Sequence, residues 1–143
     1  MTAARLTAAV LDARDPRRLA EFYAALLGWQ LETVEPDWVT VRGPHGSGAG
    51  LSFQLEPLQT APTWPARSGA PSQQMHLDVE VDDLQAAVAR AVDLGAVVET
   101  HQPQDDVRVL RDPEGHLLCL WVDGSGTPPA QERAQERAQE SQR

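Results

Sequence analysis

The sequence predicts an α+β fold made of two βαβββ modules, and an internal repeat is the main reason. One order of elements, a strand, a helix and three further strands, occupies residues 5–56 and returns in residues 74–122. An aspartate begins and a glycine ends the helix of each module, and these four residues are Asp15, Gly28, Asp83 and Gly95. Matching arginine-containing turns follow at residues 41–46 and 110–115. Because a repeat constrains architecture, we expect pseudo-twofold symmetry, with the half-sheets forming a half-open barrel cleft and the helices on the outside.

In the first module, each element has its own local signal. Residues 5–11 alternate weakly, as a half-buried strand does. Asp15 can cap a helix over residues 15–27, Pro16 suits its first position, and Gly28 can end it. The apolar face of this helix follows the helical period and consists of Leu19, Phe22, Tyr23, Leu26 and Leu27. Three strand-like runs complete the module, at residues 31–34, 38–42 and 51–56.

The second module repeats these signals after a linker. Residues 57–73 carry prolines, small residues and the isolated Trp64, which is typical of a connection between modules. We expect a helix over residues 83–94 and strands at 75–81, 97–100, 107–111 and 117–122. The domain therefore spans residues 1–123. Residues 124–143 are polar and offer no large apolar side chain to bury, so we expect a flexible tail there.

Composition excludes several classes of protein. The formal net charge is −9, and phosphate binding needs clustered Lys and Arg, so we expect no nucleic-acid partner. No apolar run is long enough to cross a bilayer, and residues 1–5 lack the apolar core of a signal peptide, so we expect no membrane partner. Cys119 is the only cysteine and cannot form an internal disulfide, which favours a cytoplasmic location.

Strand alternation predicts which side chains face the cleft, because successive residues of a strand point to opposite faces. In the strand at 75–81, the apolar set that belongs under the helix is Leu77, Val79 and Val81. In the last strand, the residues expected to face the cleft are Leu117, Cys119 and Trp121. In the strand at 51–56, Leu55 is expected to point inward and Ser52 to face the cleft. Val109, in the strand at 107–111, is also expected to face the cleft. The predicted ligand-binding set mixes aromatic and polar groups, as small-molecule pockets do, and consists of Trp38, Thr40, Arg42, Gln54, His76, Asp78, Arg111, Cys119 and Trp121.

Two arginines of this set indicate the charge of a ligand. Arg42 and Arg111 stand at equivalent points of the two modules. Guanidinium groups recognise carboxylates and other anionic oxygens with paired hydrogen bonds, which favours an anionic ligand, and the two tryptophans favour an aromatic one. The alternative is that both arginines pair with Asp78, Glu56 or Glu80 and offset an acidic sheet face.

The motifs resemble those of the vicinal oxygen chelate superfamily, which includes glyoxalase I, bleomycin-resistance proteins and extradiol dioxygenases. The resemblance covers residues 5–122 and rests on three segments: Asp-Pro-Arg-Arg-Leu-Ala-Glu-Phe-Tyr-Ala-Ala-Leu-Leu-Gly-Trp at 15–29, His-Leu-Asp-Val-Glu-Val-Asp-Asp-Leu at 76–84, and Asp-Pro-Glu-Gly-His at 112–116. The segments Phe53-Gln54 and His76-Leu77-Asp78 are most similar to those of glyoxalase-like proteins common in actinobacteria, many of which have no assigned reaction.

The resemblance implies where a metal would be held. In the metal enzymes of that superfamily, a divalent ion is bound by one residue from the first and one from the last strand of each module. Mapped through the repeat, those positions are Ala8, Gln54, His76 and Cys119. Ala8 offers no ligand atom, Cys119 replaces a common glutamate, and Gln54 is a weak ligand. We therefore predict no cofactor; a soft site for a divalent metal such as zinc, formed by His76, Gln54 and Cys119, is the alternative.

Two functions follow from the resemblance. The first is a binding protein that holds a small organic molecule, anionic or aromatic, as the superfamily's drug-resistance members do. The second is a lyase, isomerase or dioxygenase, either metal-dependent or working by acid–base chemistry with His76 and Asp78 as catalytic candidates. Members often complete their clefts across modules or subunits, which implies a homodimer, and Trp29, Trp64 and Tyr23 add aromatic surface that interfaces favour.

Overall fold

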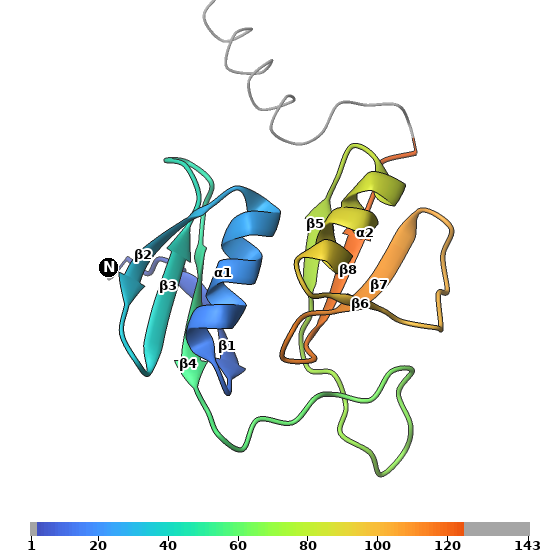
Figure 1. The fold of residues 1–143 in the computed structure, drawn as a ribbon, viewed down its shortest axis with the longest axis horizontal. Coiled ribbons are helices and arrows are strands. Elements are labelled where there is room, and N and C mark those ends of the chain that lie inside the picture. Colours follow the sequence, from blue (N-terminus) through green and yellow to red (C-terminus); the bar gives the residue numbers. More distant parts are fainter. Residues whose placement is uncertain (1–2, 125–143) are drawn as a thin grey trace, which may run out of the picture. The chain divides into compact units, whose positions relative to one another are not determined.

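The computed structural model describes residues 3–124 and confirms two βαβββ modules (Figure 1). The elements of the first module are β1 (Ala8–Ala13), α1 (Pro16–Leu27), β2 (Gln30–Val34), β3 (Trp38–Arg42) and β4 (Gly50–Leu55). Those of the second are β5 (Leu77–Glu80), α2 (Leu84–Asp93), β6 (Val97–Val98), β7 (Val107–Arg111) and β8 (Leu117–Trp121). The described residues form two compact units: the first comprises residues 3–61 and Asp112–His116, and the second comprises Pro62–Arg111 and residues 117–124.

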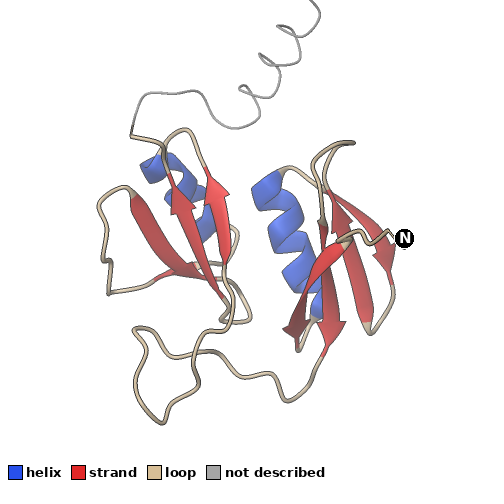
Figure 2. Cartoon of the chain, turned by 180° about the vertical axis from the view of Figure 1, so that it is seen from behind, coloured by secondary structure: helices blue, strands red, loops and turns tan. Residues whose placement is uncertain are grey.

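Each module folds into one mixed four-stranded sheet, and the two sheets have the same strand order. The orders are β1-β4-β3-β2 and β5-β8-β7-β6. In both, the first strand pairs in parallel with the last, and the other neighbours are antiparallel. A parallel pair needs a crossover of a dozen or more residues, and the helix lies within that crossover. Each helix packs on one face of its own sheet (Figure 2).

Both helices begin where the sequence predicts, and α1 also ends there, whereas α2 ends at Asp93 with Leu94, rather than Gly95, as its C-cap. The side chain of Asp15 accepts a hydrogen bond from the amide of Arg18, and Asp83 does the same for Ala86, which satisfies amides that have no partner within the helix. At the other end of α1, Gly28 has a φ of 68°, a left-handed conformation that glycine adopts without steric cost. The expected apolar face is confirmed at Leu19, Phe22 and Tyr23, which are all buried.

Several strand boundaries differ from the prediction. β1 begins at Ala8 rather than at residue 5 and continues to Ala13, because each of its residues pairs with a residue of β4. β5 is shorter than the predicted 75–81, since only four of its residues pair with β8. The strand predicted at 97–100 ends at Val98. The amide of Glu99 still bonds to the carbonyl oxygen of Val109. The amide of Val109, however, donates to the side chain of Gln102 instead of to a backbone carbonyl, so the ladder stops there.

Alternation predicted the direction of most core side chains but not how well each is covered. Val39, Val41, Phe53, Leu110, Leu118 and Leu120 are fully buried. Leu117 was expected to face the cleft, yet only 2% of it is exposed, and Ser52 and Val109 are buried too. Leu55 was expected inward but is 38% exposed, because it occupies the last position of the β1–β4 ladder, where little chain covers it.

The turn between β7 and β8, residues 112–116, lies in the second module of the sequence but packs within the first unit. Its anchor is Asp112, which is 3% exposed. Oδ2 of Asp112 accepts a 2.7 Å hydrogen bond from the hydroxyl of Tyr23. Oδ1 accepts from the amides of Glu114 and His116. Burial raises the pKa of this carboxyl despite these donors.

Two further residues of this turn bind the segment that leads into α1. The carboxylate of Glu114 accepts hydrogen bonds from the amides of Arg14 and Asp15 at 3.0 and 2.9 Å. His116 Nε2 bonds to the carbonyl oxygen of Asp12 at 2.6 Å. The 112–116 turn therefore contributes polar partners to the first unit that the first module does not supply itself.

No helix within residues 3–124 is long and apolar enough to cross a membrane. The predicted tail, residues 124–143, lies outside the described residues except for Gly124.

Candidate functional site

A pocket of about 270 Å³ opens on the sheet of the second unit. Its lining residues come from β5 and the residue before it, β7 and the loop before it, and β8, and they are His76, Asp78, Gln104, Val107, Cys119 and Trp121. Successive residues of β8 alternate between the buried core, at Leu118 and Leu120, and the pocket. Four of the nine predicted ligand-binding residues therefore lie together in one pocket: His76, Asp78, Cys119 and Trp121.

The strand register explains why these side chains meet. Asp78 lies opposite Cys119 in the parallel β5–β8 pair. Two residues further along, Trp121 lies between Glu80 of β5 and Val107 of β7. Neighbouring strands are about 4.8 Å apart, so side chains at the same register level are in reach of one another.

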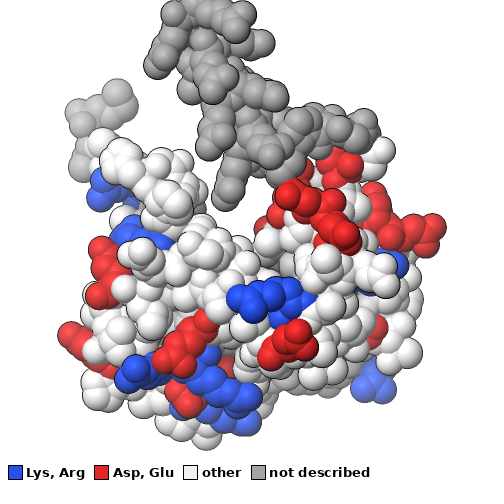
Figure 3. Space-filling model, turned by 45° about the horizontal axis from the view of Figure 1, so that its top comes forward, with Lys and Arg blue, Asp and Glu red and all other residues white. Residues whose placement is uncertain are grey.

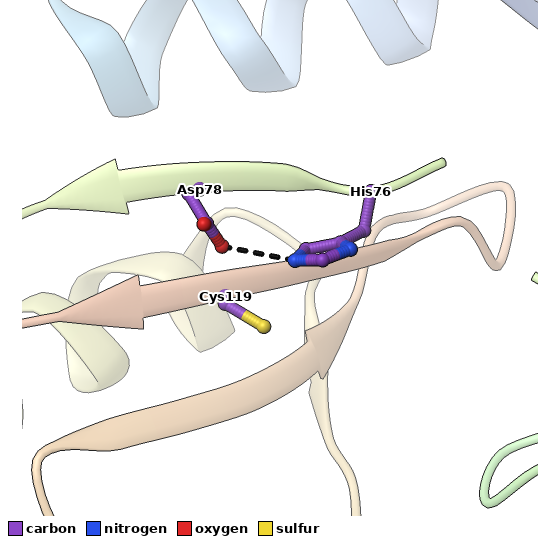
Figure 4. Close-up of side chains that lie close together, drawn as sticks. All are labelled: His76, Asp78 and Cys119. Atoms are coloured by element: carbon purple, nitrogen blue, oxygen red, sulfur yellow. Dashed lines mark hydrogen bonds and ion pairs between the residues drawn. The ribbon is translucent and has the colours of Figure 1, made fainter. Parts of the chain in front are cut away.

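His76 and Asp78 form a hydrogen-bonded dyad at the edge of the pocket (Figure 4). His76 Nε2 lies 3.0 Å from Oδ1 of Asp78. On the other side of the ring, the amide nitrogen of Gln73 lies 3.2 Å from Nδ1. With Gln73 donating to Nδ1, the imidazole carries its proton on Nε2 and donates it to Asp78. The carboxylate therefore fixes both the orientation and the tautomer of the histidine.

Cys119 projects from β8 on the same side as the dyad (Figure 4). Burial and, to a smaller extent, the negative charge of Asp78 raise the pKa of its thiol. A raised pKa keeps the sulfur in its S–H form at neutral pH, and the thiol is a poor nucleophile in that form. Nucleophilic catalysis by Cys119 is therefore not what this geometry favours.

The two predicted arginines already have carboxylate partners. Arg42 Nε lies 2.6 Å from Glu32 of β2. Arg111 pairs with Glu99 and also donates to the carbonyl oxygen of Pro62. In the strand register, Arg42 lies opposite Gln30 and Arg111 opposite Val97. In both modules, the glutamate therefore lies two residues after the residue that is opposite the arginine. The repeat thus preserves an arginine–glutamate pair, with partners that the sequence did not predict.

The remaining candidates lie in the first unit, on β3 and β4. Trp38 is opposite Gln54 in the antiparallel register, and Gln54 is exposed. Thr40 accepts a hydrogen bond from the amide of Thr33 through Oγ1, which gives it a structural partner. The sequence missed two pocket residues, Gln104 and Val107. Alternation extended from Val109 along β7 would have found Val107, whereas Gln104 lies in a loop with no periodic signal.

The register also changes the equivalence between the modules. The helix caps are Asp15 and Asp83. In each module, the residue five positions before the cap lies in the first strand and pairs with a residue of the last strand. For Asp15 that residue is Val10, which pairs with Ser52. For Asp83 it is Asp78, which pairs with Cys119. Ser52, rather than Gln54, is therefore the equivalent of Cys119.

A complete metal site of the superfamily type does not fit these residues. At the four equivalent positions, Ala8 has no ligand atom and the Ser52 hydroxyl is buried and is a poor ligand. Three possible ligand atoms do lie within 4.8 Å of one another in the second unit, on His76, Asp78 and Cys119. Those residues are the ones that could hold a zinc ion, with the thiol deprotonating on binding.

Known proteins share both the sequence pattern and the fold. A family model described as a glyoxalase-like domain matches residues 8–121. No curated protein matches the chain. Many solved structures are similar to it, and three of them illustrate the likeness.

One is a glyoxalase/bleomycin resistance protein/dioxygenase family enzyme from Burkholderia phytofirmans, with 18% identity, a TM-score of 0.62, and coverage of 83% of this chain and 98% of that one. A glyoxalase-related enzyme from Fulvimarina pelagi has 17% identity, a TM-score of 0.61, and coverage of 90% and 94%. A possible glyoxalase from Bacillus cereus has 14% identity, a TM-score of 0.60, and coverage of 83% and 99%. At these identities, the likeness concerns the fold.

Proposed function

The chain belongs to the glyoxalase-like domain family, and from this premise we propose that it binds a small organic molecule in the pocket of the second unit, without a complete metal site. The observation that carries the proposal is the grouping of the His76–Asp78 dyad with Trp121 around one pocket. A few polar groups beside an aromatic wall are the usual composition of a small-molecule site.

The size of the pocket limits the ligand. Sites for drug-sized molecules occupy about 300–1,000 Å³, and this pocket, at about 270 Å³, lies just below that range. The ligand is therefore a small metabolite-like molecule or the end group of a larger one. Trp38, Thr40, Arg42 and Gln54 belong to the first unit, and their role in ligand binding stays a prediction. The expected anionic group rested on Arg42 and Arg111, and their glutamate partners weaken that part of the prediction.

Fragment binding followed by NMR tests the proposal. We expect some small polar-aromatic fragments to shift the indole N–H signal of Trp121, which a Trp121→Phe variant identifies. The matched control is Trp29, whose indole lies against Gly43 in the first unit and whose signal should not move. A diverse fragment set that leaves the Trp121 signal unchanged would contradict the proposal.

A second candidate function is acid–base catalysis. The 3.0 Å bond from His76 to Asp78 favours it, because an oriented imidazole is the commonest general base. The basic nitrogen would be Nδ1, so a substrate would have to displace the amide of Gln73 from it. In heavy water, an active base would exchange the protons next to the carbonyl group of a small ketone, and NMR would detect this exchange. His76→Gln should abolish the exchange and His45→Gln, in an exposed turn, should not. Exchange that survives His76→Gln would exclude the dyad as its source.

We also propose that the protein forms a homodimer and acts in the cytoplasm. Sedimentation at micromolar concentration tests the assembly, and a monomer there would contradict it. The single cysteine, Cys119, supports the proposed cytoplasmic location, since the sequence holds no second cysteine for an internal disulfide. The closeness to actinobacterial proteins stays a prediction.

A further inference from the structure

We propose that the pocket of the second unit selects a small organic cation, such as an ammonium group, rather than the anion that the sequence indicated. The inference rests on the proposed function, because it names the charge of the ligand for the same pocket. It is carried by the carboxylate of Asp78 and the ring of Trp121, which line the pocket together.

The charge of the side chains that line the pocket favours a cation. Asp78 is its only carboxylate, and no arginine contributes to it. The imidazole of His76 occupies one oxygen, Oδ1, which lies 3.0 Å from Nε2. Among residues 3–124, Oδ2 takes no hydrogen bond, and 64% of the side chain of Asp78 is exposed. A negatively charged oxygen is therefore available to a ligand.

The nearby arginines would reverse the sign of the pocket's charge if they were directed into it. Arg111 is bound to Glu99 and to the carbonyl oxygen of Pro62. Arg108 donates through Nη1 to the carbonyl oxygens of Gln104, Asp105 and Val107. Arg108 thus holds the loop that carries Gln104, and its Nη1 is engaged by main-chain oxygens.

The charged residues around the pocket also favour a cation. The described part of the second unit carries nine carboxylates and four arginines. Figure 3 shows acidic side chains, in red, gathered on the surface of this unit. Asp105 and Asp106 of this unit are exposed and directly follow the pocket residue Gln104. Clustered charge of one sign raises the local concentration of ions of the opposite sign, which here are cations.

Trp121 is the aromatic residue of the pocket lining. The face of a tryptophan ring attracts a cation more strongly than that of any other side chain, and the attraction grows as water is excluded. An ammonium group that contacts Asp78 Oδ2 could place its carbon substituents against Trp121, Val107 and Cys119. Cys119 suits this role because its thiol is held neutral. A carboxylate ligand in the same position would face Asp78 and would be repelled.

Three matched compounds test the inference by NMR on the full-length protein. They are choline, its neutral isostere dimethylbutanol, in which a tert-butyl group replaces the trimethylammonium group, and the anion dimethylbutanoate. We expect choline to shift the Trp121 indole signal with an affinity about tenfold or more above that of dimethylbutanol. Dimethylbutanoate should bind more weakly than dimethylbutanol.

Variants separate the contributions of charge and shape. Asp78→Asn keeps the side-chain shape and should remove most of the preference for choline over dimethylbutanol. Asp93→Asn, an exposed residue of α2, changes the net charge equally and should keep it. Equal binding of choline and dimethylbutanol, or an unchanged preference in Asp78→Asn, would overturn the cation inference and leave the proposed binding function intact. If none of the three compounds binds and the fragment set is also silent, both proposals fail.

Discussion

The hydroxyl of Tyr23 in α1 donates a 2.7 Å hydrogen bond to the carboxylate of Asp112, which lies 89 residues further along the chain. Tyr23 is fully buried and Asp112 is 3% exposed. A hydrogen bond to a charged group in a buried place contributes more than one at the surface, because loss of one partner leaves the other without solvation. This pair therefore binds the 112–116 turn to the helix of the first unit.

Tyr23→Phe should lower the free energy of unfolding by about 1–3 kcal/mol, since it leaves Oδ2 of Asp112 without a donor. Urea denaturation followed by far-UV circular dichroism measures the change. Ser47→Ala is the control, because it also removes a hydroxyl group, but from an exposed turn where the hydroxyl donates to Pro44. A loss for Tyr23→Phe no larger than that for Ser47→Ala would show that the buried bond contributes little.

Tyr23 should remain un-ionised in the folded protein at pH values where an ordinary tyrosine titrates. Burial, followed by the charge and hydrogen bond of Asp112, raises its pKa well above 10.0. A raised folded-state pKa gives stability that is present below pH 10.0 and is lost as the pH rises through the folded value. Tyr23 is the only tyrosine in the sequence, so tyrosinate absorbance reports on it alone. We expect this absorbance to rise together with alkaline unfolding; a separate rise near pH 10 in folded protein would contradict the prediction.

The purified protein should contain well below one equivalent of transition metal. Ala8 provides no ligand, and Cys119 would have to ionise from a raised pKa. Elemental analysis after purification without chelators measures the content. Near one equivalent of metal, lost in His76→Ala and retained in His45→Ala, would show that the residues of the second unit suffice to hold an ion.

Asp78→Asn should speed alkylation of Cys119 by iodoacetamide at neutral pH. The negative charge of Asp78 is the second cause, after burial, of the raised pKa of the thiol. Removing that charge lowers the pKa and increases the thiolate fraction, which is the reacting species. Cys119 is the only cysteine, so mass spectrometry of the intact protein gives its rate directly. Asp93→Asn is the control, and equal rates in the two variants would exclude an effect of Asp78.

Local signals were enough to predict most of the fold. The caps Asp15 and Asp83, the glycine stop at Gly28 and the strand Trp38–Arg42 agree with the structure because each depends on nearby residues. The length of β6 could not be predicted, since it depends on Gln102, which bonds to a strand seven residues away.

The candidate site was predicted only in part, because only some of its features depend on nearby residues. Alternation is a local property, and it placed His76 and Asp78 on one face, where they are hydrogen-bonded. The partners of Arg42 and Arg111 depend on the register between strands, which alternation does not determine. Gln104 enters the pocket from a loop, and the position of that loop depends on Arg108.

The membership of the 112–116 turn in the first unit has a consequence for synthesis on the ribosome. Domains generally fold from the N-terminal end as the chain emerges. Here the first 61 residues include all five elements of the first module, yet Tyr23 has no acceptor until Asp112 has been made. The amides of Arg14 and Asp15 likewise await Glu114. The nascent first module must therefore stay incompletely stabilised until almost the whole domain has left the exit tunnel, so the two modules complete their folding together.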